Sequence, residues 1–179
     1  MSELPKRADI NMSGFKLELV ADDLSGLTCD QTAIMKYFNL KTQGKRFASR
    51  ADINPSEISS YIPYVFLFDV EVDDEGNLIE MKIRLLGTKL AEFYGEQTGK
   101  TFIDDKSETS LQKTLPDTQS RLERSVRMVL KHRKPIRSHA QQVSDEKDYV
   151  QVKVIMVPLS DNGTDINKIF GYTELIHTS

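Results

Sequence analysis

The stretch RLLGTKLAEFYGEQTGKTF, from Arg84 to Phe102, decides how the fold is interpreted. Glycines stand at three points in it: after an alternating strand pattern, after a short amphipathic segment, and before Lys100. Glycine adopts the backbone angles of tight corners and helix ends more readily than other residues. The stretch therefore predicts a strand, a corner, one short helix and a second corner.

Strand and helix patterns lie on both sides of this stretch. Before it, apolar residues recur at every second position in two runs that predict an antiparallel hairpin: Phe66, Phe68, Val70 and Val72, then Ile79, Met81, Ile83 and Leu85. After it, we expect a long helix that ends near Pro135. Three strands should follow: Ile136–Val143, Tyr149–Pro158 and Lys168–His177. This order predicts an α+β domain with a five-stranded antiparallel sheet and helices on one face.

We place this domain at residues 61–179 and divide the preceding chain in two. Residues 1–27 show only a brief apolar alternation, so we expect an N-terminal arm there. Residues 28–60 predict an N-terminal helical extension, because Thr28 and Gln31 have capping-box spacing and Gly44 can stop a helix. The pentapeptide RADIN occurs at 7–11 and again at 50–54, and we interpret this short repeat as chance.

The strand alternation also leaves apolar side chains on the far face of the sheet. A patch of that kind is normally covered, and the helix that begins near Thr28 has a suitable apolar stripe. It could cover the patch within one chain or across a homodimer. This predicted interaction surface consists of Ile34, Tyr37, Phe38, Leu67, Ile155 and Val157.

Charge is unevenly distributed in a chain whose net charge is −3. The window from Arg121 to Arg137 holds seven bases and one acid, which gives it a charge of +6. On the expected long helix, Arg124, Arg127 and Lys131 could meet an acidic protein or the phosphates of a nucleic acid. Aromatic residues that would stack on bases are absent from the window, so nucleic acid is the weaker alternative.

Several classes of protein are disfavoured by what the sequence lacks. No apolar run approaches the roughly 18 residues of a membrane helix, and we expect a cytoplasmic protein without a membrane partner. The single Cys29 cannot form an intramolecular disulfide. No catalytic or metal-binding spacing is recognised, and the segment GEQTGKT has three residues between its glycines where a phosphate-binding loop has four. We therefore expect no enzyme, no catalytic residue and no metal site.

The order of elements resembles the PAS family of sensory modules over about residues 60–178. The landmarks of the resemblance are Gly87–Leu90, Gly95, Gly99-Lys100 and the run PLSDNGTDINKIFGYTEL. The upstream segment RADINPSEISSYIPYVFLFDVE is similar to that of a bacterial subgroup of single-domain PAS proteins. The resemblance implies a stand-alone sensory or signalling module that binds an unidentified small molecule or a signalling protein. Such a module relays its signal by conformational change or dimerisation.

PAS proteins bind haem, flavin, small carboxylates, apolar metabolites or nothing, and the sequence does not identify a cofactor for this chain. Flavin photochemistry in the family uses a cysteine opposite the flavin ring, whereas Cys29 lies before the sheet. Haem needs an axial ligand, for which His132 or His139 would have to serve. Both histidines suit ordinary polar positions at a helix end and a strand start, so the sequence argues against haem as well as flavin.

The resemblance and the alternation together place a ligand pocket between the inward sheet face and the helices. Tyr94 and His139 are the polar groups expected to orient a ligand. Core packing is the alternative for each lining residue, and it would make the protein a ligand-free interaction adaptor. The predicted lining is Phe66, Phe68, Ile83, Leu85, Leu90, Phe93, Tyr94, Phe102, Leu130, His139, Val154 and Met156.

Overall fold

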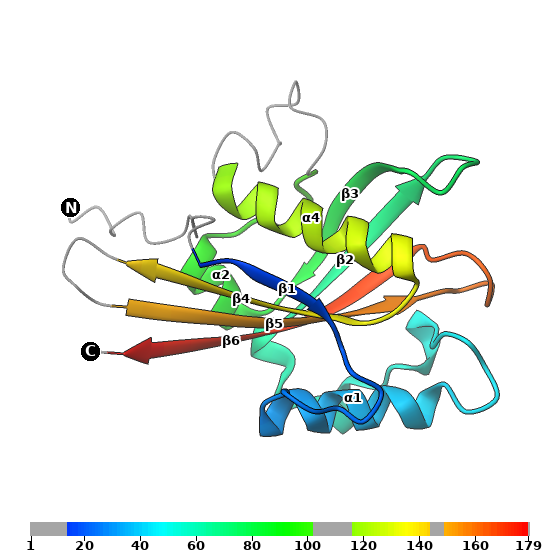
Figure 1. Ribbon diagram of the computed structural model, residues 1–179, viewed down its shortest axis with the longest axis horizontal. Coiled ribbons are helices and arrows are strands. Elements are labelled where there is room, and N and C mark those ends of the chain that lie inside the picture. The colour runs from blue at the N-terminus through cyan, green and yellow to red at the C-terminus, as the bar shows by residue number, and fades with distance from the viewer. Residues whose placement is uncertain (1–13, 102–115, 144–148, 179) are drawn as a thin grey trace.

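The computed structural model describes residues 14–101, 116–143 and 149–178, and every structural statement below concerns these residues. One antiparallel sheet has the strand order β1-β4-β5-β6-β2-β3 (Figure 1). Its strands are β1 Lys16–Leu19, β2 Val65–Val72, β3 Leu78–Leu86, β4 Ile136–Val143, β5 Tyr149–Leu159 and β6 Lys168–Thr178. The helices are α1 Cys29–Lys41, α2 Thr88–Tyr94 and α4 Pro116–His132, with single 3₁₀ turns η1 Arg50–Asp52, η2 Pro55–Ile58 and η3 Ile62–Tyr64. The predicted α+β class is confirmed.

The sheet has six strands, whereas the sequence predicted five. The sixth is β1, which lies inside the segment expected to be an arm and pairs with β4 from Lys16↔His139 to Leu19↔Ile136. Its four residues are too few to show a clear alternation, and the pairing partner follows more than a hundred residues later. The partly buried side chains of Phe15, Leu17 and Leu19 pack against the main core.

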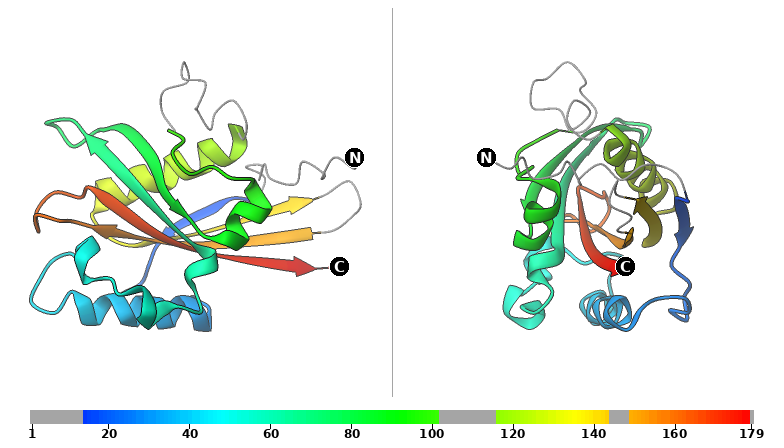
Figure 2. Two further views of the ribbon diagram at one scale, coloured as in Figure 1. Left: turned by 180° about the vertical axis from the view of Figure 1, so that it is seen from behind. Right: turned by 90° about the vertical axis from the view of Figure 1, so that its left-hand side faces the viewer.

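Helices cover both faces of the sheet, not one. Helix α4 lies on one side and α1 on the other (Figure 1), and two further views show the same separation (Figure 2). The main core joins the sheet to Leu90 of α2 and to Val126 and Val129 of α4. A second core joins the opposite face to Ile34 and Phe38 of α1. The apolar far face predicted from the alternation is therefore covered within the chain.

Two register shifts between β2 and β3 change which residues of β3 face the main core. The pairing passes from Glu71↔Glu80 to Val72↔Leu78, which leaves Ile79 outside the ladder and 52% exposed. It passes from Leu67↔Leu85 to Phe68↔Ile83, which leaves Arg84 unpaired. A bulge of this kind reverses the inward and outward positions that follow it. The sequence predicted one inward row of Ile79, Met81, Ile83 and Leu85. Because of the two bulges, this prediction is wrong for Ile79 and Leu85.

The glycines of the deciding stretch take the predicted positions around α2. Gly87 is the N-cap of α2, and Gly95 is its C-cap with φ 81°, in the region that favours glycine. A Cβ atom added at Gly87 would lie 2.4 Å from the carbonyl oxygen of Pro63. Close backbone contact thus requires glycine at the first corner, whereas a positive φ favours it at the second.

The predicted Thr28 capping box is confirmed at the start of α1, whereas the ends of α1 and α4 do not use glycine. Helix α1 begins with Thr28 as its N-cap in a capping box with Gln31, and it ends at Lys41, before Gly44. Helix α4 ends at His132, where Arg133 takes φ 55° and donates its N–H to the Val129 carbonyl at 2.7 Å. The Arg133 guanidinium lies over the Phe47 ring and donates to the Thr164 carbonyl. Arginine therefore occupies a position that usually favours glycine.

Candidate functional site

A pocket lies between the main-core face of the sheet and helices α2 and α4. The pocket is partly open to solvent: about 40 Å³ of it admits the centre of a water molecule, within about 450 Å³ of space that no atom fills. The apolar part of the wall comes mostly from the strands, with one residue each from α2 and α4. It consists of Phe66, Phe68, Ile83, Leu86, Leu90, Leu122 and Val154. Polar side chains complete the wall: Tyr94, Gln97, Thr118, Arg121 and Thr173.

Half of the predicted lining lies around this pocket. Those six residues are Phe66, Phe68, Ile83, Leu90, Tyr94 and Val154. Met156 is fully buried in the main core, and Phe93 and Leu130 pack against that core without lining the pocket. Phe102 lies outside the described residues.

Leu85 and His139 do not belong to the pocket. Leu85 packs against the second core, under α1, because the bulge at Arg84 turns it to the far face. Ser138 and Ala140 are buried on β4, so the alternation turns His139 to the opposite side. There His139 lies across from Lys16 and Lys153 and lines a separate polar groove of about 460 Å³. The expectation that His139 orients a ligand beside Tyr94 is wrong in this structure.

Arg121 is the pocket residue with the most unusual environment. The side chain is 2% exposed and is among the largest fully buried groups in the described chain. One guanidinium N–H donates to the Tyr94 hydroxyl at 3.3 Å, while the Nε atom is buried without a hydrogen-bond partner. No ion pair to Arg121 occurs among the described residues. Arginine stays protonated in proteins, so the pocket holds a permanent positive charge.

Gln97 adds an unpaired acceptor to the same pocket. Its Nε2 atom donates to the Tyr94 carbonyl at 2.8 Å, which fixes the orientation of the amide. Its Oε1 atom is buried and accepts no hydrogen bond. Buried polar atoms in folded proteins are nearly always paired, so two unpaired atoms in one pocket indicate that something else pairs with them.

Helical spacing in the sequence could have shown that Arg121 points inward. Counting it among the bases of the charged window did not show this. Arg121 was counted with the basic window, yet its side chain lies on the buried side of α4. Thr118, three residues earlier, and Ser125, four residues later, are buried as well. Spacings of three and four residues place these groups on one helix face. Helical position, more than residue type, identifies Arg121 as an inward group.

The predicted apolar interaction surface is occupied by contacts within the chain. Ile34, Phe38, Leu67, Ile155 and Val157 are all buried in the second core. The centres of the Phe38 and Phe170 rings lie 4.7 Å apart. Tyr37 packs against the edge of this core, and its hydroxyl accepts a hydrogen bond from the Asn54 backbone N–H at 2.9 Å. These residues therefore offer no free docking face in this structure.

The predicted basic surface is exposed but largely engaged. Arg124, Arg127 and Lys131 are exposed along α4. Arg127 forms an ion pair with Glu123 at 2.8 Å, and the Arg124 guanidinium lies 5.5 Å from the centre of the Phe15 ring. Two of the three charges thus already have neighbours within the chain, which weakens the case for a phosphate-binding stripe.

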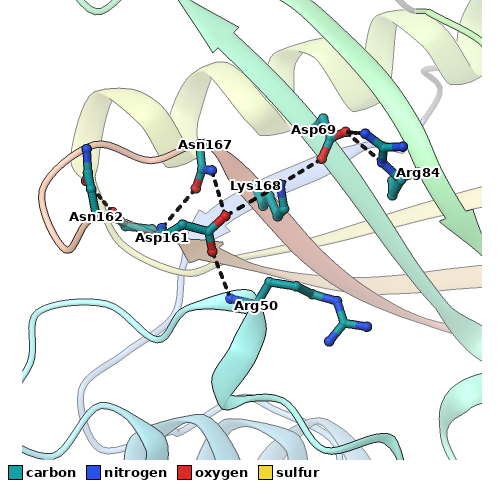
Figure 3. Close-up of polar contacts among 8 residues, drawn as sticks. Arg50, Asp69, Arg84, Asp161, Asn162, Asn167 and Lys168 are labelled. Atoms are coloured by element: carbon teal, nitrogen blue, oxygen red, sulfur yellow. Dashed lines mark hydrogen bonds and ion pairs between the residues drawn. The ribbon is translucent and has the colours of Figure 1, made fainter.

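A polar cluster, which we call the clasp, joins the sheet to the segment after α1 (Figure 3). Lys168 lies 3.2 Å from Asp69 and 3.6 Å from Asp161, while Arg84 pairs with Asp69 at 2.7 Å. Asp161 also accepts hydrogen bonds from the Asn167 amide at 3.0 Å and from the Arg50 backbone N–H at 3.1 Å. The Asn167 hydrogen bond, followed by the Arg50 N–H and the Lys168 charge, holds the pKa of Asp161 below its usual 3.8.

The second RADIN copy has a structural explanation for most of its residues. Asp52 accepts from the Ser49 backbone N–H at 2.8 Å, and Asn54 is the N-cap of η2. Ile53 is buried in the second core, and the Arg50 N–H belongs to the clasp. The first copy lies outside the described residues.

Comparison with known proteins places most of the chain in one family. A family model described as a PAS domain matches residues 28–174. The match begins at the N-cap of α1, so it includes the helical extension and strands β2 to β6 but not β1. No curated protein matches the chain. Within the described residues, no group of acidic, histidine or cysteine side chains could hold a metal ion, and no helix has the length and apolar character needed to cross a membrane.

Proposed function

The chain belongs to the PAS domain family, and from this premise we propose that it senses a small molecule bound in the pocket beneath α2 and α4. The family implies a sensory or signalling module in general. The observation that carries the specific proposal is the pairing of an apolar wall with two unpaired buried polar atoms, Arg121 Nε and Gln97 Oε1. Pockets that bind small molecules commonly combine such walls with a few polar groups that orient the ligand.

The relay that we propose runs through strands that have a core on each face. On β5, Val154 lines the pocket while Ile155, the next residue, is buried beneath α1. On β2, Phe66 lines the pocket while Leu67, the next residue, is buried in the second core. A ligand that shifts these strands would change the packing of α1, because close-packed cores respond to small displacements.

The output of the module is a changed contact with another protein. We propose either release of α1 from the far face or a changed position of α4, whose basic side suits an acidic partner. A homodimer through the far face would require α1 to leave it, since α1 covers that face within the chain. We further propose that the module is not an enzyme, and the expected cytoplasmic location stays a prediction.

Native mass spectrometry of protein purified from cells, joined to hydrogen exchange, tests this function. We expect a bound small molecule, and we expect its removal to increase exchange in α2 and α4 and also in α1. Filling the pocket with Val154→Phe should block binding, whereas the matched variant Val157→Phe, on the α1 side, should not. A chain purified without bound mass, whose exchange is unaffected by any cell extract fraction, would exclude the sensor.

A ligand-free adaptor is the second candidate, and the small space in the pocket, about 40 Å³ open to the centre of a water molecule, is the observation that favours it. In an adaptor, Arg121 and Gln97 would be paired by water only. Partner binding by an adaptor would be lost on reversing Arg124 and Lys131 and would be unchanged by Val154→Phe. A sensor would respond to the pocket substitution as well.

A further inference from the structure

We infer that the pocket ligand is a small hydroxycarboxylate, of about the size of lactate, whose carboxylate pairs with Arg121 and whose hydroxyl donates to Gln97. The inference rests on the proposed function, since it names the class of ligand for the same pocket. It draws on the charge, the hydrogen-bonding capacity and the volume of the pocket.

The positive charge of Arg121 is the reason for assigning a carboxylate to the ligand. A buried arginine without a counter-ion is costly, because buried charges in proteins are normally paired. Tyr94 supplies one neutral contact at 3.3 Å, and Nε remains unpaired. Nε and a terminal nitrogen of a guanidinium form one side of the fork that binds both oxygens of a carboxylate. A neutral ligand would leave the charge uncompensated.

The unpaired Gln97 Oε1 acceptor is the reason for assigning a hydroxyl group to the ligand. Gln97 Oε1 needs an O–H or N–H donor, which a simple fatty acid anion lacks. An ammonium group would supply N–H donors but would bring a second positive charge beside Arg121. Among the described residues that line the pocket there is no aspartate or glutamate to balance it. A hydroxyl group satisfies the acceptor without adding charge, so a hydroxy acid fits better than an amino acid.

Volume sets the size of the ligand. The space of about 40 Å³ that admits the centre of a water molecule is roughly three times what one water needs by the same measure. The apolar wall, which includes Phe68, Leu90 and Val154, suits a short hydrocarbon group. A molecule with a carboxylate, a hydroxyl and a methyl group uses each of these features, and a longer tail would have to extend into the open part.

Isothermal titration of the full chain with four probes tests the assignment: lactate, propionate, lactamide and alanine. Propionate lacks the hydroxyl, lactamide lacks the charge, and alanine adds an ammonium. We expect lactate to bind at least tenfold more tightly than each of the other three, because the loss of one charge-assisted or buried hydrogen bond has about that effect. Lactamide binding as tightly as lactate would overturn the carboxylate assignment, and propionate doing so would overturn the hydroxyl assignment.

Substitutions separate recognition from stability. Arg121→Met keeps the length and removes the charge, and replacing an uncompensated buried charge with an apolar group is compatible with folding. We expect it to weaken lactate binding at least tenfold, with lactamide binding and the melting temperature unchanged or raised. Arg124→Met, on the exposed side of the same helix, is the matched control and should bind lactate as the parent does. Equal losses for lactate and lactamide in Arg121→Met would make Arg121 a structural residue.

The outcomes distinguish this inference from the proposed function. If a ligand found by mass spectrometry binds in the pocket and is uncharged, the sensor stands and the hydroxycarboxylate assignment fails. If Val154→Phe leaves all binding and exchange unchanged, the pocket itself is not a ligand site and both fail.

Discussion

Gly171 on β6 lies directly opposite Phe66 on β2, and the aromatic ring occupies the space above the glycine. A Cβ atom added to Gly171 would stand 1.8 Å from the Phe66 ring, so the ring would have to move. Because Phe66 lines the pocket, we expect Gly171→Ala to cost about 1–3 kcal/mol in unfolding free energy, as overpacking does, and also to alter ligand binding. Chemical denaturation and titration with the bound ligand measure the two effects.

A double-mutant cycle supplies the control for this contact. Phe66→Leu removes the ring and should relieve the clash, so the double variant should be less destabilised than the sum of the two single variants. Strict additivity would show that Gly171 does not act through Phe66.

Single residues also show where sequence reasoning stopped short. Tyr94 and Leu90 were placed at the pocket by the family resemblance together with the strand alternation, and both line it. Arg121 was only counted among the bases of the charged window, and its position on the helix was not used, although it is buried. The unpaired Gln97 acceptor depends on the path of the chain after Gly95, which a local pattern does not determine. Unpaired buried atoms are properties of the folded arrangement.

Strand β3 offers a test of the register at the scale of one element. Leu78 is 7% exposed and Ile79 is 52% exposed, in reverse of the simple alternation. Leu78→Ala should therefore lower the unfolding free energy by about 2–4 kcal/mol, whereas Ile79→Ala should change it by about 0.5 kcal/mol or less. Each variant is the control for the other in equilibrium denaturation. Equal losses, or a larger loss at Ile79, would mean that the bulge is misplaced.

The clasp should make the attachment of η1 dependent on pH. The folded pKa of Asp161 lies below 3.8, so its stabilising contribution is complete above that value and is lost as the pH falls through the lowered folded pKa. We expect Asp161→Asn to cost on the order of 1 kcal/mol near neutral pH, a modest amount because the carboxylate is 45% exposed. Below the folded pKa, the difference between parent and variant should disappear.

Denaturation of parent and variant across the acid range measures this dependence. Asp74→Asn changes the same charge on the exposed β2–β3 turn and is the matched control. A difference between the parent and Asp161→Asn that stays constant with pH would show that the lost interaction does not involve the carboxylate charge.

Elements were easier to predict than their register. The starts of β4, β5 and β6 lie at the residues expected from alternation and turn signals. The two bulges of β3 could not be found in this way, because a bulge depends on the partner strand as well as on local sequence. Leu85 was therefore placed on the wrong face. β1 escaped notice because its pairing with β4 spans most of the chain.

On the scale of the whole molecule, α1 completes the fold by closing the second core. Phe38→Ala should lower the unfolding free energy by about 3–5 kcal/mol, since the ring is 1% exposed and packs on Phe170. Leu40→Ala on the same helix should have little effect, because Leu40 is 67% exposed. If α1 can separate from the sheet, Phe38→Ala should also speed hydrogen exchange in α1 before the strands exchange.

Sedimentation of these two variants tests the relay. Exposure of the second core should make Phe38→Ala associate at concentrations where Leu40→Ala and the parent do not. Unchanged association with fast exchange in α1 would argue that output does not use the far face. The sequence predicted that this face would be covered, but whether the cover came from the same chain required the three-dimensional path of residues 42–64.

Arg133, directly after the end of α4, affects how this helix can move. Its side chain reaches past the last turn to the ring of Phe47, in the segment after α1, and to the Thr164 carbonyl in the β5–β6 turn. The helix that carries Arg121 is thus tethered just beyond its C-terminal end to the segment after α1 and to the β5–β6 turn. If this helix tilted, Arg133 would pass the movement to the segment after α1 around the edge of the sheet. This connection does not run through the strands.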